Sequence, residues 1–329
     1  MHHPLDVVAV GNALLDVLTA GDEAFLAEHG MVKGAMVLID ADQADRLYAG
    51  MGPAVEVSGG SAANTAVGVA SFGGDAAFVG RVRDDQLGAV FAHDIRAAGV
   101  EFPVRPATDG SPSGRSLILV TPDAERTMAT FLGASGELTS ADVDDAVIGR
   151  AAVTFLEGYL FDRPPAKEAY FRAAAAAHRA RRRVALTLSD VFCVERHRDE
   201  FRRLVREQVD VLFANELELC RLYEVVEPDD ALAAAADHCE TVALTRSERG
   251  SVVLHAGARV AVPAHPVEHV VDTTGAGDLY AAGFLYGLTR GHDAELCGRL
   301  GSLAAAEVIS HVGARPVANL AELAEPLLG

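Results

Sequence analysis

The segment 271–284, VDTTGAGDLYAAGF, combines residue types that could hold an anion and accept a proton. Gly275 and Gly277 permit a tight turn and let a ligand approach the backbone closely. The amides that open the following helix lie at the positive end of its dipole, which favours an anion. Asp278 would repel a phosphate there unless its carboxylate takes a proton from the attacking group. The alternative is a glycine turn whose acidic residue stabilises the helix dipole, and a lone GxGD pattern would favour it.

Other polar and glycine residues follow three expected strands. They are Gly11, Asn12 and Asp16 after the apolar run 5–10, Gly59, Gly60 and Asn64 after 55–58, and Asn215 after 211–213. Ligands of open α/β sheets bind at the carboxyl ends of the strands. Asn64 lies one turn into a helix of small residues and offers both a donor and an acceptor. The sequence therefore predicts that these loops and the 271–284 segment share one site.

The order of the expected elements predicts an α/β fold. Helices are expected at 61–72, 86–98, 164–180, 195–206, 276–288 and 294–310. Strands are expected at 5–10, 76–82, 153–156, 184–188, 211–213 and 242–245, with a late hairpin at 251–262. Apolar strands that alternate with helices indicate a parallel sheet covered on both faces.

The segment 115–131 interrupts this alternation. Two strands, 115–120 and 126–131, flank a turn at 121–125, which indicates a β-hairpin. With the β-like runs at 17–20 and 35–39, this hairpin could build a small separate sheet. No linker or clean domain boundary is visible, so we expect a single domain over residues 1–329.

Composition limits the class of protein and its partners. The chain has 329 residues, of which 50% are apolar, so it can bury a sizeable core. Its formal net charge of −19 argues against nucleic acid as a partner. We see neither a run of about twenty apolar residues nor a signal peptide, so we expect a cytoplasmic protein without a membrane contact.

The cysteines and histidines do not suggest a metal site. The four cysteines lie far apart without a CxxC pair, so we expect reduced thiols packed in the core. His265 and His269 are four residues apart, but Pro266 between them would break the helix needed to align them as ligands.

Three motifs resemble those of the PfkB, or ribokinase-like, kinase family. The segment 272–278, DTTGAGD, is similar to the family's DTxGAGD signature, 59–64, GGSAAN, to its glycine-rich motif, and 215–218, NELE, to its NxxE element. Their order and spacing agree with the family along nearly the whole chain. The resemblance implies a Rossmann-like three-layer fold with a parallel-rich central sheet and a small β lid, formed by segments about 17–39 and 115–131. It also implies ATP-dependent phosphorylation of a hydroxymethyl group.

The resemblance implies a role for each motif. Asp278 would be the general base, and the residues that bind the migrating phosphoryl group would be Gly275, Ala276 and Gly277. Asn215 and Glu218 would order Mg²⁺ and its water near the phosphates of ATP. Without the resemblance, a helix-capping Asn with an exposed Glu one turn on would explain this pair.

The acceptor side resembles that of the adenosine kinases within the family. The segment 11–16, GNALLD, is similar to their GNPLLD stretch, with Ala in place of Pro. The resemblance implies a ribose held by charged and polar groups from two loops. The residues expected to bind this part of the substrate are Asn12, Asp16, Gly59, Gly60 and Asn64.

Further positions follow from the same resemblance. Arg126 lies in a segment similar to the family's lid turn and would reach the phosphates. Tyr159 and Leu160 fall where adenosine kinases contact the base, although strand-end packing explains Tyr159 equally well. In the nucleotide loop, Thr245 and Gly250 match the family pattern while Ser247 replaces its middle glycine. The segment 312–315 resembles one that borders the nucleotide and, in some members, a monovalent cation, which we leave unassigned.

The expected function is ATP-dependent phosphorylation of the 5′-hydroxyl of a nucleoside, with adenosine as the leading acceptor. A sugar kinase acting on ribose, fructose or a keto-deoxy sugar acid is the first alternative, although Asp16 argues against an anionic sugar acid. A non-catalytic nucleoside or nucleotide sensor is the second, and the intact Asp278 counts against it. A dinucleotide oxidoreductase is disfavoured because no GxGxxG follows the first strand. The expected partner is a small molecule, and the chain is expected to be a monomer or homodimer.

Overall fold

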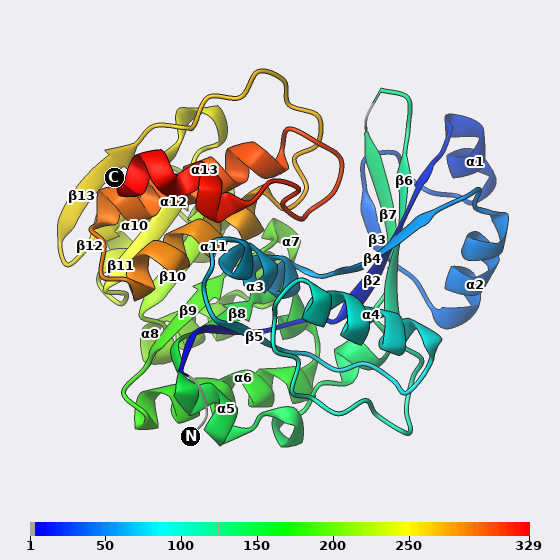
Figure 1. The fold of residues 1–329 in the computed structure, drawn as a ribbon, viewed down its shortest axis with the longest axis horizontal. Coiled ribbons are helices and arrows are strands. Elements are labelled where there is room, and N and C mark those ends of the chain that lie inside the picture. Colours follow the sequence, from blue (N-terminus) through cyan, green and yellow to red (C-terminus); the bar gives the residue numbers. More distant parts are fainter. Residues whose placement is uncertain (1–3, 124) are drawn as a thin grey trace.

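The structure is a computed structural model that describes residues 4–123 and 125–329, and this part of the chain contains two β-sheets (Figure 1). The larger sheet has the strand order β13-β12-β11-β10-β9-β8-β1-β5. Its strands pair in parallel from β11 to β5, whereas β12 and β13 add an antiparallel edge. Their bounds are β1 Leu5–Val10, β5 Ala76–Val79, β8 Ala151–Glu157, β9 Arg183–Thr187, β10 Val211–Asn215, β11 Thr241–Thr245, β12 Ser251–His255 and β13 Ala258–Val262. The parallel-rich central sheet is confirmed.

Helices cover both faces of the large sheet (Figure 1). Side chains alternate along β1, so that Val8 and Val10 pack into one core and Val7 and Ala9 into the other. The first core includes α5 Asp145–Arg150, α6 Pro164–Arg179, α7 Val191–Arg196, α8 Arg198–Gln208, α9 Glu216–Tyr223 and α10 Pro228–Ala236. The second includes α3 Ser61–Ser71, α4 Gln86–Ala97, α11 Ala276–Thr289, α12 Ala294–Val308 and α13 Leu320–Leu328. The expected three layers are therefore present.

The small sheet has the strand order β3-β7-β6-β2-β4 and lies beside the large sheet, with two short helices on its outer side (Figure 1). The bounds are β2 Leu14–Ala20, β3 Met36–Leu38, β4 Val55–Gly59, β6 Gly114–Val120, β7 Arg126–Phe131, α1 Glu23–Glu28 and α2 Ala41–Gly50. Val17, Leu117 and Ala129 pack on one face with buried residues of α2. Because strand side chains alternate, the neighbouring residues Asp16 and Ser116 face the opposite side. That side lines a cavity.

The hairpin at 115–131 is confirmed as β6 and β7. The small sheet is larger than the segments 17–39 and 115–131, because β4 pairs with β2 and completes one edge. The sequence predicted a strand at 55–58 but did not include it in the small sheet. α13 was not expected either.

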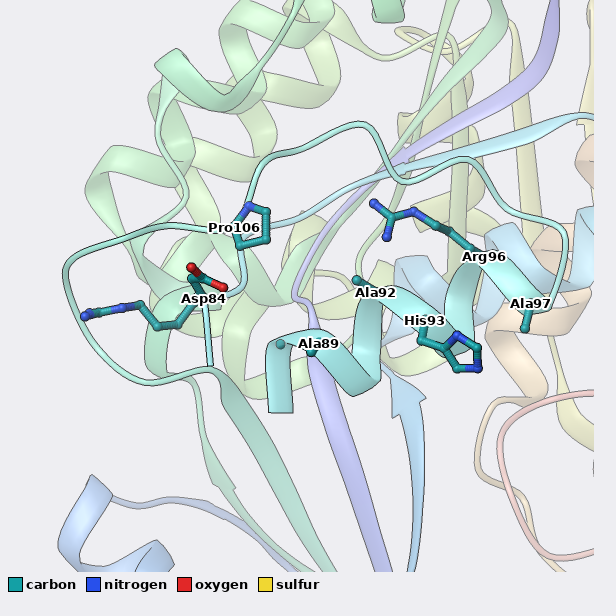
Figure 2. A pocket seen from close by; sticks show the side chains of 9 residues that line it. Asp84, Ala89, Ala92, His93, Arg96, Ala97 and Pro106 are labelled. Atoms are coloured by element: carbon teal, nitrogen blue, oxygen red, sulfur yellow. The ribbon is translucent and has the colours of Figure 1, made fainter. Parts of the chain in front are cut away.

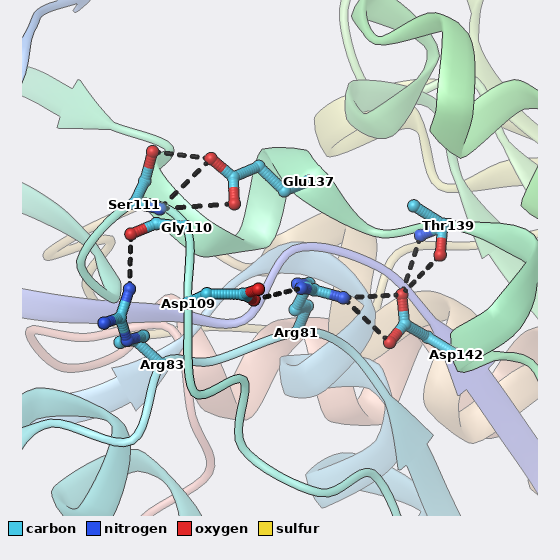
Figure 3. A network of polar contacts seen from close by, with 8 residues as sticks. All are labelled: Arg81, Arg83, Asp109, Gly110, Ser111, Glu137, Thr139 and Asp142. Carbon is cyan, nitrogen blue, oxygen red and sulfur yellow. Dashed lines mark hydrogen bonds and ion pairs between the residues drawn. The ribbon is translucent and has the colours of Figure 1, made fainter.

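Polar contacts anchor the loop that leads into the small sheet (Figure 3). Arg81 Nη1 donates to Asp142 Oδ1 at 3.1 Å, in the 3₁₀ turn Ser140–Asp142. Ser111 Oγ donates to Glu137 Oε1 at 2.6 Å, in the 3₁₀ turn Gly133–Glu137. These turns follow β7 directly. Both ends of the β6–β7 hairpin are therefore tied to the body of the molecule.

All four cysteines are buried, as expected for core packing. Within residues 4–123 and 125–329, no helix is long and apolar enough to cross a membrane.

Candidate active site

A cavity of about 1340 Å³ is lined by residues from both sheets. The small sheet contributes the inward face of β2, β6 and β7. The large sheet contributes residues at the carboxyl ends of its parallel strands, namely Glu157, Thr187, Asn215 and Thr245. This is the edge at which open α/β sheets bind ligands. The loops that the sequence singled out therefore meet in one place.

The turn before α11 forms the end of this cavity. Gly275 is the N-cap of α11 with φ 79°, a left-handed conformation, and a Cβ there would meet Ala314. α11 is 14 residues long, so its first amides carry the positive end of a substantial dipole. Gly275, Ala276 and Gly277 all line the cavity, as the anion-site prediction requires.

Asp278 lies in the first turn of α11 and contacts α3. Its carboxylate accepts hydrogen bonds from Ser61 Oγ at 2.6 Å and Asn64 Nδ2 at 3.0 Å. Burial raises the pKa of Asp278, and these two hydrogen bonds oppose the rise. Asn64 was expected to bind ribose, but its NH₂ group is directed to Asp278. Asn64 therefore supports the Asp278 carboxylate and also lines the cavity.

Asp16 points from β2 into the cavity. Burial raises its pKa to about 7, while the positive charges of Arg315 and Arg126 oppose the rise. A Cβ on Gly59 would collide with the Asp16 carboxylate, so this glycine makes room for the acid. Gly59 itself does not line the cavity, whereas Gly60 does. Gly59 therefore affects the cavity through the space that it leaves for Asp16, and its direct contact with substrate stays a prediction.

Glu157 was not identified from the sequence, although it is a charged residue at the end of an apolar strand. It is fully buried and accepts from Asn12 N at 2.8 Å, Asn12 Nδ2 at 2.7 Å and Ala62 N at 2.8 Å. Burial raises its pKa to about 7. Asn12 Oδ1 in turn accepts from Ser135 Oγ. The polar atoms of Asn12 are therefore bonded within the protein, although Asn12 also lines the cavity, and its expected contact with ribose stays a prediction.

Arg126 occupies a different place from the one expected. Its guanidinium forms an ion pair with Asp272, and the two side chains are 7% and 5% exposed. Asp272 also accepts from Thr274 N at 3.0 Å and Gly313 N at 2.9 Å. Arg126 is not part of the cavity lining. The ion pair connects the small sheet to the segment that leads into the anion turn.

Asn215 and Glu218 form a reciprocal cap at the start of α9. Asn215 Oδ1 accepts from Glu218 N at 2.8 Å, and Glu218 Oε2 accepts from Asn215 N at 2.9 Å. This geometry is the capping alternative, yet both residues also line the cavity. Burial raises the pKa of Glu218 to about 7.

The donor set suits a hydrated Mg²⁺ rather than a bare one. Among the described residues, no group of three His, Cys, Asp or Glu side chains could hold a metal. A single carboxylate that accepts hydrogen bonds matches an ion that keeps its water and is held largely by phosphates. Glu218 and Asn215 therefore fit Mg²⁺ through water.

The remaining predictions divide between the cavity and the core. Tyr159 and Thr245 line the cavity. Leu160 is 1% exposed and packs in the core, so it cannot contact a base there. Gly250 is buried outside the cavity lining and follows the 3₁₀ turn Ser247–Arg249. Ser247 has φ 52°, so this residue adopts the glycine conformation that the family pattern expects at its position.

A second hollow, of about 540 Å³, lies against α4 (Figure 2). Two arginines line it, but both are engaged: Arg83 donates to Gly110 O, and Arg96 Nη2 donates to Phe102 O at 3.0 Å. It contains no residue of the glycine turn and no strand end. The larger cavity is therefore the candidate site.

A carboxylate in the first turn of a glycine-capped helix, at the cavity between two sheets, suits the transfer of a phosphoryl group to a hydroxyl group. The family comparison agrees: the pfkB family carbohydrate kinase model matches residues 43–320, and the chain belongs to this family.

Similar proteins include both nucleoside and sugar kinases. Adenosine kinase from Sinorhizobium meliloti is 53% identical, with a TM-score of 0.92 and coverage of 98% of this chain and 99% of that one. A probable sugar kinase from Rhizobium etli CFN 42 is 49% identical, with a TM-score of 0.92 and 99% coverage of both. Adenosine kinase from Saccharomyces cerevisiae is 27% identical over 93% of this chain and 95% of its own length.

Proposed function

We propose that this kinase transfers the γ-phosphoryl group of ATP to the 5′-hydroxyl of a nucleoside, with adenosine as the acceptor. The observation that carries the proposal is the Asp278 carboxylate, held by Ser61 and Asn64 beside the first amides of α11. Asp278 takes the proton of the hydroxyl as its oxygen attacks the γ-phosphorus. The bond from that phosphorus to the ADP oxygen then breaks, and the products are AMP and ADP.

The anion turn stabilises charge during this transfer. Gly275 and Gly277 present backbone amides without a side chain in the way, and Gly277 has open space where a Cβ would be. Mg²⁺, when bound, neutralises charge on the phosphates. Asn215 and Glu218 orient the water around it. Thr245 belongs to the nucleotide side of the same cavity.

Apolar surface in the cavity supports a nucleoside over a free sugar. Met36 and Leu38 of β3 are 43% and 48% exposed, and Phe192 at the start of α7 is 69% exposed, yet all three line the cavity. A purine base would cover this apolar surface, whereas a free sugar such as ribose would leave it exposed to water. Asp16 would accept hydrogen bonds from the ribose hydroxyls at the other end of the acceptor.

The small sheet serves as a lid in this proposal. Its inward face lines the cavity, and the Arg126–Asp272 ion pair joins it to the segment before the anion turn. Closure over the acceptor would exclude water from the phosphoryl donor.

A sugar kinase is the second candidate, favoured by the similarity to the probable sugar kinase. An ATP-consumption screen over adenosine, guanosine, inosine, cytidine, ribose and fructose separates the two. Turnover of adenosine supports the proposal. Turnover of a sugar with none of the nucleosides refutes the acceptor assignment.

Asp278→Asn tests the base. The amide keeps the shape but cannot accept the proton, so kcat should fall by roughly 10³ to 10⁴ fold while ATP binding persists. Asp293→Asn is the matched control, because Asp293 caps α12 outside the site and Asn also caps. Its kcat should equal that of the unmodified protein. Retention of more than about a tenth of kcat in Asp278→Asn would show that another group takes the proton.

A further inference from the structure

Arg315 lies behind the candidate site, in the loop that follows α12. Its side chain is 13% exposed. Its Nε donates to Asn64 Oδ1 at 3.3 Å, and its Nη1 donates to Asp94 Oδ2 at 3.4 Å. Asn64 Nδ2 donates in turn to the Asp278 carboxylate at 3.0 Å. These four side chains form a continuous polar chain from α4 to the catalytic turn.

The two ends of this chain decide how the Asn64 amide is oriented. A guanidinium can only donate hydrogen bonds, and an ionised carboxylate can only accept them. The amide oxygen must therefore face Arg315 and the NH₂ group must face Asp278, because the opposite flip would lose both bonds. Asn64 is 4% exposed, so water does not readily replace a lost partner.

Asp94 holds Arg315 at the far end of the chain. Its Oδ2 also accepts from Ser58 N at 2.9 Å and from Ser58 Oγ. Ser58 directly precedes the glycine pair at 59–60, so the same carboxylate fixes the strand that leads into the acceptor loop. Arg315 does not line the cavity. Arg315 therefore acts on the cavity through its neighbours, by its hydrogen bond to Asn64 and by its positive charge, which opposes the raised pKa of Asp16.

We infer that Arg315 is a positioning residue for phosphoryl transfer, which orients Asn64 and, through Asn64, the Asp278 carboxylate that faces the acceptor hydroxyl. The inference rests on the proposed role of Asp278 as the base. The inferred role differs from the roles of the motif residues, because Arg315 neither contacts the substrate nor takes a proton. Its contribution is the fixed orientation of one amide.

A double-mutant cycle on kcat tests the inference. The variants are Arg315→Met, Asn64→Ala and the two combined, assayed with saturating ATP and the acceptor found in the screen. Arg315→Met should lower kcat about tenfold or more, with a change in the KM for ATP of less than about threefold. In the Asn64→Ala background the same change should lower kcat less than about twofold, because the residue it acts through is gone. Multiplicative losses in the double variant would overturn the inference.

Two further variants separate positioning from general structural damage. Arg81→Met is the matched control. Arg81 pairs with Asp142, and its side chain is 19% exposed. Like Arg315, Arg81 has one buried nitrogen without a hydrogen-bond partner among the described residues. An equal loss of kcat in Arg81→Met would contradict a specific role. Arg315→Lys keeps a donor for Asn64 and should recover part of the kcat, which retains a test if Arg315→Met does not fold. An Arg315→Lys protein that folds but recovers none of the kcat lost in Arg315→Met would also contradict the positioning role.

The base assignment is tested separately in the same assay. Retention of more than about a tenth of kcat in Asp278→Asn would refute the role of Asp278 as the base, on which the inference rests. An inactive Asp278→Asn together with multiplicative losses in the cycle would refute only the role of Arg315.

Discussion

Replacement of Glu157 by Gln should make the stability of the protein less sensitive to rising pH. Glu157 is fully buried and its carboxylate accepts three hydrogen bonds, two from Asn12 and one from Ala62 N. Gln has nearly the same shape and can keep the two bonds to Asn12. Its NH₂ group would face the Ala62 N–H, a loss that does not depend on pH. The comparison across pH therefore isolates the ionisation of Glu157.

The sign of the effect follows from the raised pKa. Burial raises the pKa of Glu157 from 4.5 to about 7. Between these values the folded protein binds more protons at Glu157 than the unfolded chain does, so the free energy of unfolding decreases as pH rises through this window. The full rise corresponds to about 3 kcal/mol. Because Glu157 also interacts with the nearby charge of Asp278, we expect a difference of about 1–3 kcal/mol.

Urea unfolding at pH 5 and pH 8 measures this difference. The unmodified protein should lose about 1–3 kcal/mol more than Glu157→Gln on going from pH 5 to pH 8. Glu207→Gln is the control, because Arg203 lowers the pKa of this exposed carboxyl, the opposite direction to the shift of Glu157. Glu207→Gln should follow the unmodified protein. Equal pH dependence in Glu157→Gln and the unmodified protein would refute the argument that burial opposes the ionisation of Glu157.

Two further predictions concern the acceptor and the lid. Asp16→Ala should lower kcat/KM for adenosine about tenfold to a few hundredfold, since it removes charge-assisted hydrogen bonds worth about 1.5–3 kcal/mol, and 2′-deoxyadenosine should lose less. Unchanged kinetics with ribosides would show that Asp16 does not hold the ribose. Amide hydrogen exchange in segments 17–39 and 115–131 should slow when nucleoside binds, as expected for a lid that closes over the cavity. Equal exchange with and without nucleoside in both segments would argue against a lid.

Local sequence was sufficient wherever the interaction partners lie close together in the chain. The glycine turn and Asp278 are parts of one helix start, because Gly275 adopts the left-handed conformation that ends the preceding loop. The cap between Asn215 and Glu218 spans only three residues. The hairpin at 115–131 was likewise predicted from two β-like runs that flank a short turn, since its paired strands are neighbours in the chain.

Tertiary structure decided which polar groups meet across the site. Glu157 and Asn12 are 145 residues apart, and Arg315 and Asn64 are 251 apart, so no local pattern connects them. The sequence predicted that Asn12 and Arg126 bind ligands. In the structure Asn12 donates to Glu157, and Arg126 forms an ion pair with Asp272. Strand order brings these residues to one edge of the sheet. Burial there then requires each donor and acceptor to find a partner inside the protein, and only the packed structure determines which partner that is.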